Sequence, residues 1–192
     1  LDINRVIGFK GFGLKIWNAV TFFLKFAIAD TNFKPDLSTI HVDNPKLSFI
    51  DRWILNKLSR TIKNFNTSLE NYSFGEAVQV IYSFWKDCLC DVYIEAIKAV
   101  IKSGSEEQKE LTRNILFKSI DSALKIMHPI TPFITEELYQ RVHFEVLLKT
   151  NPDADQESIP SVCVAEFPSD LSFINDDIER FGDLVGEIAH KI

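Results

Sequence analysis

Apolar residues recur every three or four positions through most of this chain, and this spacing constrains the fold more than any other feature. It places them on one face of an α-helix, whereas a half-buried strand would alternate apolar and polar side chains. Strand-like alternation is close to absent. The clearest stripes are Ile16, Val20, Phe23, Ala27; Ile54, Leu58, Ile62, Phe65, Leu69; Ala77, Ile81, Phe84, Cys88, Val92; and Leu111, Ile115, Ile120, Leu124, Met127. The pattern predicts an all-α fold, an antiparallel bundle of four to five long helices.

Capping residues and prolines set the expected helix boundaries. Ser48, Ser73 and Ser105 each precede an apolar stripe and are placed to cap a helix. Pro129 must end the preceding helix, because proline lacks the amide hydrogen, and Pro132 is tolerated in the first turn of the next one. We expect helices from somewhere in 4–13 to about 30, from 48 to about 70, 73 to about 102, 105 to 127, 131 to about 142, and about 178 to 192.

By composition the chain divides into three parts. Residues 1–148 hold the long stripes and form the expected helical domain. Residues 149–170 are polar, acidic and interrupted by prolines, so we expect a loop or insertion there. Residues 171–192 predict an amphipathic helix, the truncated start of a C-terminal extension.

Charge is distributed unevenly along the chain. The net charge is −6, but residues 151–192 carry ten acidic and two basic side chains, a local charge of −8. Residues 1–34 carry five basic and two acidic side chains, a local charge of +3. The N-terminal part therefore has a modest basic patch that the whole-chain average hides.

Several features bound the cellular environment. No apolar run approaches the roughly 20 residues that span a bilayer, and the N-terminus lacks the layout of a secretory signal. Three cysteines, Cys88, Cys90 and Cys163, cannot all pair, so we expect buried, reduced thiols. These features fit a cytoplasmic protein with no membrane partner. Because the chain also lacks an initiator methionine, we expect it to be a segment of a longer protein.

Residue types that carry catalysis do not converge in the sequence. The four histidines, at positions 41, 128, 143 and 190, are isolated, and none pairs at a spacing such as His-x-x-x-His. The glycine-rich run 8–13 lacks the preceding strand and the spacing of a phosphate or dinucleotide loop. We therefore expect no catalytic, metal-binding or cofactor-binding residue in this chain.

The first expected helix has an unusual polar face. Lys15, Asn18, Phe22 and Lys25 follow steps of three, four and three, which stacks them on one side. The opposite side already has enough apolar residues, among which we place Trp17, so Phe22 is surplus to the fold. Two interpretations are open. The ring packs against a neighbouring helix between solvated lysines, or it stacks on a base of single-stranded RNA while the lysines contact phosphates and the amide bonds a base edge.

Four strings, taken together in order and spacing, resemble the anticodon-binding helical domain of class I aminoacyl-tRNA synthetases. They are KIWNAVTF (15–22), DRWILNKL (51–58), NYSFGEAVQVIYSFWKDCLCDVYIEAIK (71–98) and ALKIMHPITPFITEELYQRV (123–142). The last is similar to valine, isoleucine and leucine enzymes alike. Residues 90–95 most resemble the valine-specific members, and 159–168 is similar to an insertion in their cytosolic eukaryotic forms.

The resemblance implies an α-helical domain that holds a valine-specific tRNA by its anticodon stem-loop, together with the remaining domains of a parent synthetase. The parent would use ATP to activate valine, but the chain has no His-Ile-Gly-His-like or Lys-Met-Ser-Lys-Ser string, so we expect no aminoacylation and no cofactor in this part. The resemblance implies base stacking by Phe22 and a cation at Lys15, with Arg5 and Lys10 as phosphate partners. No DNA partner is implied.

Two other interpretations stay open. The chain is a helical protein-interaction module whose exposed aromatic residues dock a partner without RNA, or it comes from the isoleucine-specific relative. Salt separates RNA binding from apolar docking, because binding through lysines weakens steeply with added salt.

Overall fold

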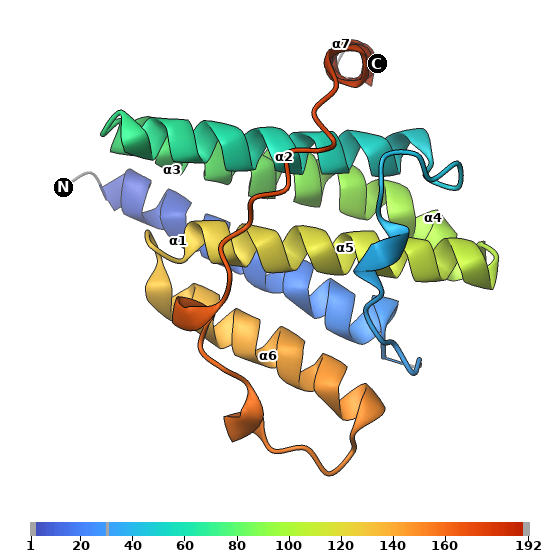
Figure 1. Ribbon diagram of the computed structural model, residues 1–192. Coiled ribbons are helices and arrows are strands. Elements are labelled where there is room, and N and C mark those ends of the chain that lie inside the picture. Colours follow the sequence, from blue (N-terminus) through green and yellow to red (C-terminus); the bar gives the residue numbers. More distant parts are fainter. Residues whose placement is uncertain (1–2, 30, 190–192) are drawn as a thin grey trace.

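The computed structural model describes residues 3–29 and 31–189, with side chains described for 10–29, 31–156 and 158–182. Within these residues the chain is helical without strands, which confirms the all-α class (Figure 1). The helices are α1 (Ile3–Phe22), α2 (Phe49–Glu70), α3 (Phe74–Ser83), α4 (Glu95–Ser103), α5 (Glu106–Met127), α6 (Pro132–Thr150) and α7 (Asp176–Ala189). Two π-helical segments, η1 (Phe23–Ala27) and η3 (Phe84–Ile94), continue α1 and join α3 to α4.

Two of the three expected serine caps are present. Ser48 and Ser105 each form a capping box, with Asp51 and Gln108 three residues later, and α2 and α5 begin directly after them. Ser73 occupies the N-cap position of α3, as expected, but makes no side-chain cap hydrogen bond. The turn there is shaped instead by Tyr72, whose φ of 56° is in the left-handed region.

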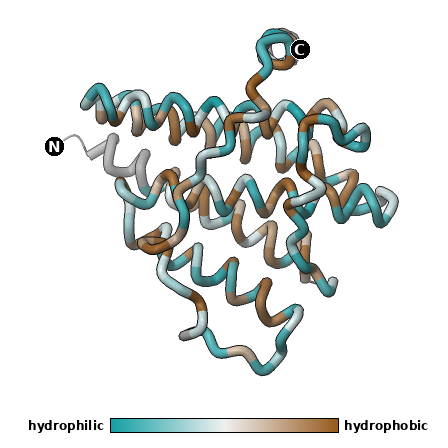
Figure 2. The backbone as a smooth tube through the Cα atoms, in the orientation of Figure 1, coloured by the Kyte–Doolittle hydropathy of each residue, from teal (hydrophilic) through white to brown (hydrophobic). Residues whose placement is uncertain are grey.

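The run from α3 through η3 to α4 is the central rod of the bundle. It packs against α1, α2 and α5, as its wide apolar stripe requires. The largest fully buried side chains include Trp85, Tyr93 and Phe84 from this rod, with Phe23 and Phe65 from its neighbours. Figure 2 shows apolar segments recurring along each long helix of the bundle. The buried face of α1 belongs to the same continuous core as the central rod, and this packing fixes the position of α1.

The helix α6 is longer than expected. It begins at Pro132, as proline in a first turn allows, but continues to Thr150 rather than ending near residue 142. The expected boundary at 148 therefore falls inside its last turn, and the division of the chain into three units stays a prediction.

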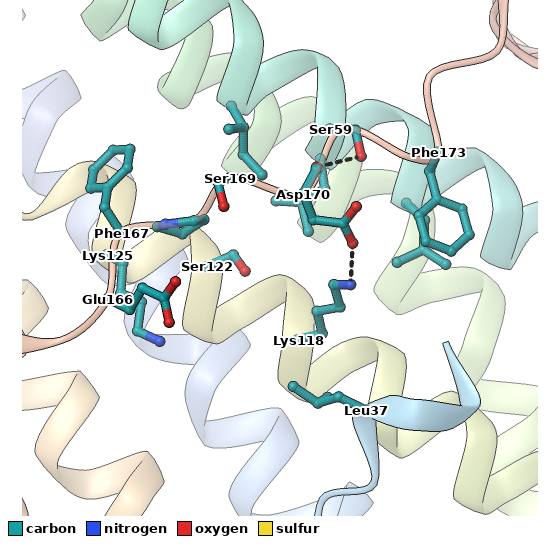
Figure 3. Close-up of a pocket in the computed structure, with 14 residues that line it drawn as sticks. Leu37, Ser59, Lys118, Ser122, Lys125, Glu166, Phe167, Ser169, Asp170 and Phe173 are labelled. Atoms are coloured by element: carbon teal, nitrogen blue, oxygen red, sulfur yellow. Dashed lines mark hydrogen bonds and ion pairs between the residues drawn. The ribbon is translucent and has the colours of Figure 1, made fainter. Parts of the chain in front are cut away.

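The acidic stretch after α6 crosses the bundle in front of α5 and α2 (Figure 1). It contains the short 3₁₀ turns η4 (Gln156–Ser158) and η5 (Val162–Val164). Asp170 fastens it to the bundle, since Lys118 Nζ lies 2.6 Å from its carboxylate and Ser59 Oγ donates to its carbonyl at 3.0 Å (Figure 3). The three cysteines, all within the described residues, are free thiols. Cys88 and Cys90 are half-buried and Cys163 is exposed, which corrects the expectation that all three are buried.

The last described helix, α7, crosses over α2 and is seen end-on in Figure 1. Asn175 caps it by accepting hydrogen bonds from two amides of its first turn. Glu179 accepts from Asn56 at 2.6 Å and pairs with Lys57, which anchors the helix to α2. The expected end of this helix at 190–192 lies outside the described residues.

Among the helices that the structure describes, none combines the length and the apolar character that crossing a membrane requires.

Candidate nucleic-acid interface

The surface of α1 and of η1, which continues it, presents most of the polar residues that the sequence singled out. Lys10, Asn18 and Lys25 are exposed. Lys15 is half-buried, with 34% of its side chain exposed. Arg5 belongs to α1, but its side chain lies outside the described residues. Three of the six predicted contacts are therefore open to a ligand without rearrangement.

A shallow groove separates α1 from the central rod. Lys15, Asn18 and Phe22 line its α1 side. The opposite wall comes from η3 and α4, through Cys90, Asp91, Ile94, Glu95 and Lys98. The groove brings together three of the predicted residues with acidic and basic groups of the rod, which no sequence pattern had connected to them.

Lys15 is not a free cation. Its ammonium group forms an ion pair with Asp91, Nζ to Oδ1 at 2.5 Å. Glu95 and Lys98 pair in the same way at 2.6 Å on the opposite wall. The groove is therefore electrostatically mixed, and a phosphate approaching Lys15 would also meet the Asp91 carboxylate.

Burial beside this ion pair affects Cys90. Desolvation raises the pKa of its thiol to about 12, with the nearby Lys15 ammonium working against the rise and the Asp91 carboxylate adding to it. The thiol is therefore protonated at neutral pH and acts as a small apolar part of the groove wall.

Phe22 contributes to the fold and also to the surface. Its ring is partly buried and packs against the core, so the expectation that it is surplus to the fold is wrong. It stacks on Phe26, with ring centroids 5.8 Å apart and an interplanar angle of 27°. Phe26 is 67% exposed. The ring that faces water is thus Phe26, which sequence reasoning missed although it lies one helical turn beyond Phe22.

The π-helical segment η1 shapes the turn after Phe22. Ile28 N donates to Phe23 O at 3.1 Å, an i+5 bond that widens the turn. Lys25 is exposed in this turn and does not line the groove. Arg113 donates to Ala27 O at 2.7 Å, which satisfies a carbonyl at the helix end and fixes its position.

The interpretation of Trp17 as a core residue is wrong. Its side chain is 37% exposed, and the guanidinium group of Arg141 lies 5.1 Å from the ring centroid. This arrangement is a cation–π contact between α1 and α6. It lies on a helix position that the sequence pattern assigned to the buried side.

Comparison with known proteins locates this fold among translation proteins. The family model described as the anticodon-binding domain of tRNA ligase matches residues 51–192. The chain is 33% identical over 196 residues to a valine–tRNA ligase of Caenorhabditis elegans, covering all of this chain and 18% of that protein. It is 31% identical over 194 residues to the Homo sapiens valine–tRNA ligase, covering all of the chain and 14% of that protein.

A bacterial relative gives a similar result. The valine–tRNA ligase of Thermotoga maritima is 35% identical over 170 residues, 87% of this chain and 18% of that protein. The chain thus spans less than a fifth of the length of these relatives. The match of the family model begins in α2, whereas the alignments to the Caenorhabditis elegans and Homo sapiens proteins cover the entire chain, α1 included.

Proposed function

The chain belongs to the anticodon-binding domain family of tRNA ligases, and from this premise we propose that it recognises the anticodon stem-loop of a valine tRNA. It would do so as one domain of a valine–tRNA ligase, holding the tRNA while a catalytic domain elsewhere in the parent protein performs ATP-dependent aminoacylation. The relatives named above favour valine over isoleucine, since they are valine–tRNA ligases.

The observation that carries the proposal is the exposed ring of Phe26, stacked on Phe22 and adjacent to Lys25. A base that stacks on an exposed aromatic ring gains roughly 1–3 kcal/mol whatever its sequence, because every base has a π-face. Phe22, which packs against the core, stacks on the Phe26 ring and so holds that ring in place before RNA binds. Asn18, one turn earlier, has an amide that suits a base edge.

Charge on this surface sets the expected salt dependence. Lys10 and Lys25 are the exposed lysines of α1 and η1 whose side chains are described, and Lys15 is engaged with Asp91. The slope of log affinity against log salt is about −0.7 for each phosphate neutralised on a single strand. Two phosphates therefore predict a slope of about −1.4, which Arg5 would steepen if its side chain reaches the loop.

The test is a titration of the protein with a valine anticodon stem-loop at several salt concentrations. Binding with a slope of about −1.4 that is lost when the anticodon bases are made abasic supports the proposal. A stem-loop with a closed tetraloop in place of the anticodon loop is the matched control. No binding of either RNA would favour the protein-interaction module instead, and equal binding of both would contradict anticodon recognition.

The same proposal implies two further assignments. The remaining domains of the parent ligase are the expected protein partner, because the chain covers so little of its relatives. We place the activity in the cytoplasm, a reducing compartment that would keep the three cysteines as thiols.

A further inference from the structure

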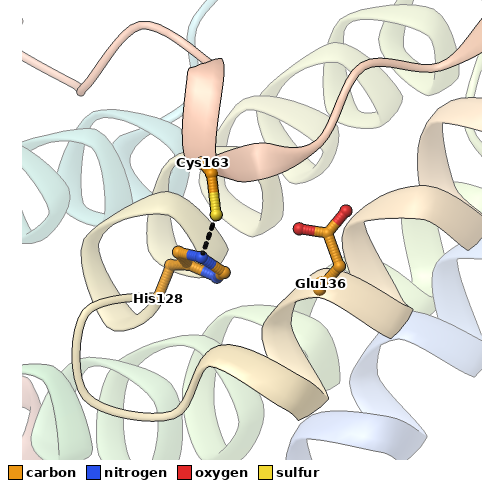
Figure 4. A group of neighbouring side chains, drawn as sticks. All are labelled: His128, Glu136 and Cys163. Carbon is orange, nitrogen blue, oxygen red and sulfur yellow. Dashed lines mark hydrogen bonds between the residues drawn. The ribbon is translucent and has the colours of Figure 1, made fainter.

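Three potential metal ligands from three parts of the chain meet beside the start of α6 (Figure 4). His128 directly follows α5, Glu136 lies near the start of α6, and Cys163 belongs to η5. One imidazole nitrogen, one carboxylate oxygen and the thiol sulfur all lie within 4.8 Å of one another. His128 Nε2 is 3.1 Å from Cys163 Sγ. The cluster lies on α5, α6 and η5, away from the groove beside α1.

Thr135 fixes the tautomer of the histidine. Its hydroxyl donates to Thr131 O at 2.8 Å and lies 2.8 Å from His128 Nδ1. Because the hydroxyl hydrogen is committed to the carbonyl, the oxygen accepts from Nδ1–H. The proton of the neutral ring is then on Nδ1, and Nε2 turns its lone pair toward Cys163. Metal-ligating histidines have this arrangement, with an outer partner on the second nitrogen.

Glu136 is also held in place. Its carboxylate accepts hydrogen bonds from Ser161 Oγ at 2.8 Å, from the Val162 amide at 3.2 Å and from Gln140 Nε2 at 2.9 Å. A carboxylate offers about four acceptor positions, so one remains for another ligand. These three donors hold the carboxylate in place and leave one of its acceptor positions open as a preformed ligand.

We propose that His128, Glu136 and Cys163 bind a divalent transition-metal ion of the Zn²⁺ type. The ligands are Nε2, a carboxylate oxygen and the thiolate, and a water occupies the fourth position. At zinc bond lengths of about 2.0–2.3 Å, tetrahedral ligands lie roughly 3–4 Å apart, so the observed separations need only small side-chain movements. On binding, the sulfur–hydrogen bond is replaced by a sulfur–metal bond and the proton leaves to solvent.

The ligand set selects the class of ion. Mg²⁺ and Ca²⁺ prefer six or more oxygen ligands, whereas imidazole and thiolate favour Zn²⁺ and its neighbours in the transition series. Because Cys163 belongs to the segment that crosses the bundle, a bound ion would join this segment to the turn between α5 and α6. The ion would therefore stabilise the fold of this segment. Because Cys163 is exposed, the ion can enter the site from solvent.

The test uses the untagged, fully reduced protein and Zn²⁺ alone as the titrant in calorimetry. We expect one equivalent to bind, and we expect Co²⁺ at the same site to give a thiolate charge-transfer absorption band. Hydrogen exchange of η5 should slow when Zn²⁺ is added. Cys163→Ser should weaken binding at least tenfold and abolish the cobalt band. Thr135→Val, which removes only the outer partner of the histidine, should weaken binding about ten- to a hundredfold.

Matched controls change the same residue types elsewhere. Cys90→Ser, His41→Gln and Glu137→Gln should leave the affinity for Zn²⁺ unchanged. Since Cys163 is exposed, its replacement preserves the fold and decides the outcome. No saturable binding of Zn²⁺, or binding that survives Cys163→Ser, would overturn the site and leave a simple thiol–imidazole hydrogen bond. Neither result bears on RNA binding, which uses another face.

Discussion

Phe22 and Phe26 stack on each other one turn apart, yet the two rings differ in exposure. Phe22 packs against the core, and Phe26 is 67% exposed. The two residues therefore separate the packing role from the binding role within a single aromatic pair. Replacing each in turn distinguishes a stacking platform from a structural contact.

Phe26→Ala should reduce affinity for the valine anticodon stem-loop about ten- to a hundredfold, because base stacking on an aromatic ring contributes roughly 1–3 kcal/mol. The free energy of unfolding should change by less than about 0.5 kcal/mol, as is typical of an exposed position. Filter binding and urea denaturation measure the two quantities. Phe133→Ala, which removes a ring 89% exposed on α6, is the control and should leave affinity unchanged.

The partner substitution should behave differently. Phe22→Ala should lower the free energy of unfolding by about 2 kcal/mol, roughly half the 3–5 kcal/mol lost when a fully buried phenylalanine is truncated. Affinity should fall as well, since Phe26 loses its support. A Phe26→Ala variant that loses stability but keeps its affinity for the stem-loop would contradict the assignment of Phe26 as the base-stacking ring.

Asp91→Asn should strengthen RNA binding. The substitution releases Lys15 from its ion pair and removes a negative charge that faces incoming phosphates. Affinity should rise roughly two- to tenfold, and the slope of log affinity against log salt should steepen by about 0.7, the value for one more phosphate on a single strand. A salt titration of both proteins measures the change.

The matched control for this release is Asp87→Asn on the same helical rod. Asp87 is exposed and pairs with Lys86 at 3.3 Å, and it does not line the groove. The Asp87→Asn substitution removes the same charge from the protein but leaves the ion pair between Lys15 and Asp91 in place. An equal gain from both variants would show that net charge alone, rather than Lys15, controls affinity.

Tyr93→Phe tests the polar contact at the centre of the bundle. The buried hydroxyl of Tyr93 donates to Asp51 Oδ1 at 2.9 Å, while Asp51 Oδ2 accepts from Ser48 in the capping box. Without the hydroxyl, one buried carboxylate oxygen loses its donor, and the free energy of unfolding should fall by about 1.5–3 kcal/mol. Urea denaturation measures it. Tyr72→Phe, at a side chain 80% exposed, should have no such effect.

Stability should fall as pH rises above 9. The pKa of the Cys90 thiol is about 12 in the folded protein against an ordinary value of 9.0, so the folded state keeps a proton that the unfolded state loses. The contribution of the Cys90 thiol to the free energy of unfolding is complete below pH 9. It declines as pH rises toward 12, by at most about 1.4 kcal/mol for each pH unit.

The Cys90→Ala variant isolates that contribution. Burial raises the pKa of Tyr93 too, but an unfolded tyrosine titrates only near pH 10, so the interval from pH 9 to 10 belongs mainly to the thiol. There the wild-type free energy of unfolding should fall about 1 kcal/mol further than that of the variant. Between pH 6 and 8 the difference between the two should stay constant. Parallel curves at all pH values would refute the assignment.

The helices and most of their boundaries could be predicted because local chemistry determines them. Ser48 and Ser105 cap helices in the way that their sequence neighbours require. Ser73 has the same kind of neighbours but makes no cap bond, and its ψ of 61° differs from the extended values of 167° at Ser48 and 156° at Ser105. The extra turns of α6 beyond residue 142 were missed although Val146 continues the four-residue spacing of Leu138 and Val142 and packs against the core.

The candidate surface was predicted only in part, for reasons that lie in tertiary structure. The i+5 bond at Phe23 alters the turn after Phe22, and apolar spacing does not encode it. Asp91 lies 76 residues from Lys15, so their ion pair had no sequence signature. His128 and Cys163 are 35 residues apart and meet only because the acidic segment folds back across the bundle. Isolated histidines in a sequence need not be isolated in space.

Gly182→Ala should detach α7 from the bundle. A Cβ at Gly182 would lie 2.3 Å from Cδ1 and Nε1 of the Trp53 indole, closer than real contacts allow, and Trp53 is itself buried in the core. Because the indole cannot yield, the helix must move. Amides of α7 should then exchange with solvent faster, and protease should cut before Asp176, while the bundle that ends with α6 keeps its unfolding midpoint.

The control is Gly75→Ala, at a helical glycine with nothing within 4 Å of the added methyl group. It should stabilise the protein by about 0.5–1 kcal/mol, because alanine loses less backbone freedom in a helix than glycine. The ion pairs of Glu179 with Lys57 and of Asp176 with Arg60 remain available in Gly182→Ala, as does the contact of Phe181 with Phe49, and these would have to hold the helix. These contacts need α7 at the distance that the added methyl group excludes, so they weaken as the helix moves away. Unchanged exchange rates in α7 would mean that Trp53 repacks, and that the ion pairs and the Phe49–Phe181 contact rather than the glycine–indole contact fix the helix.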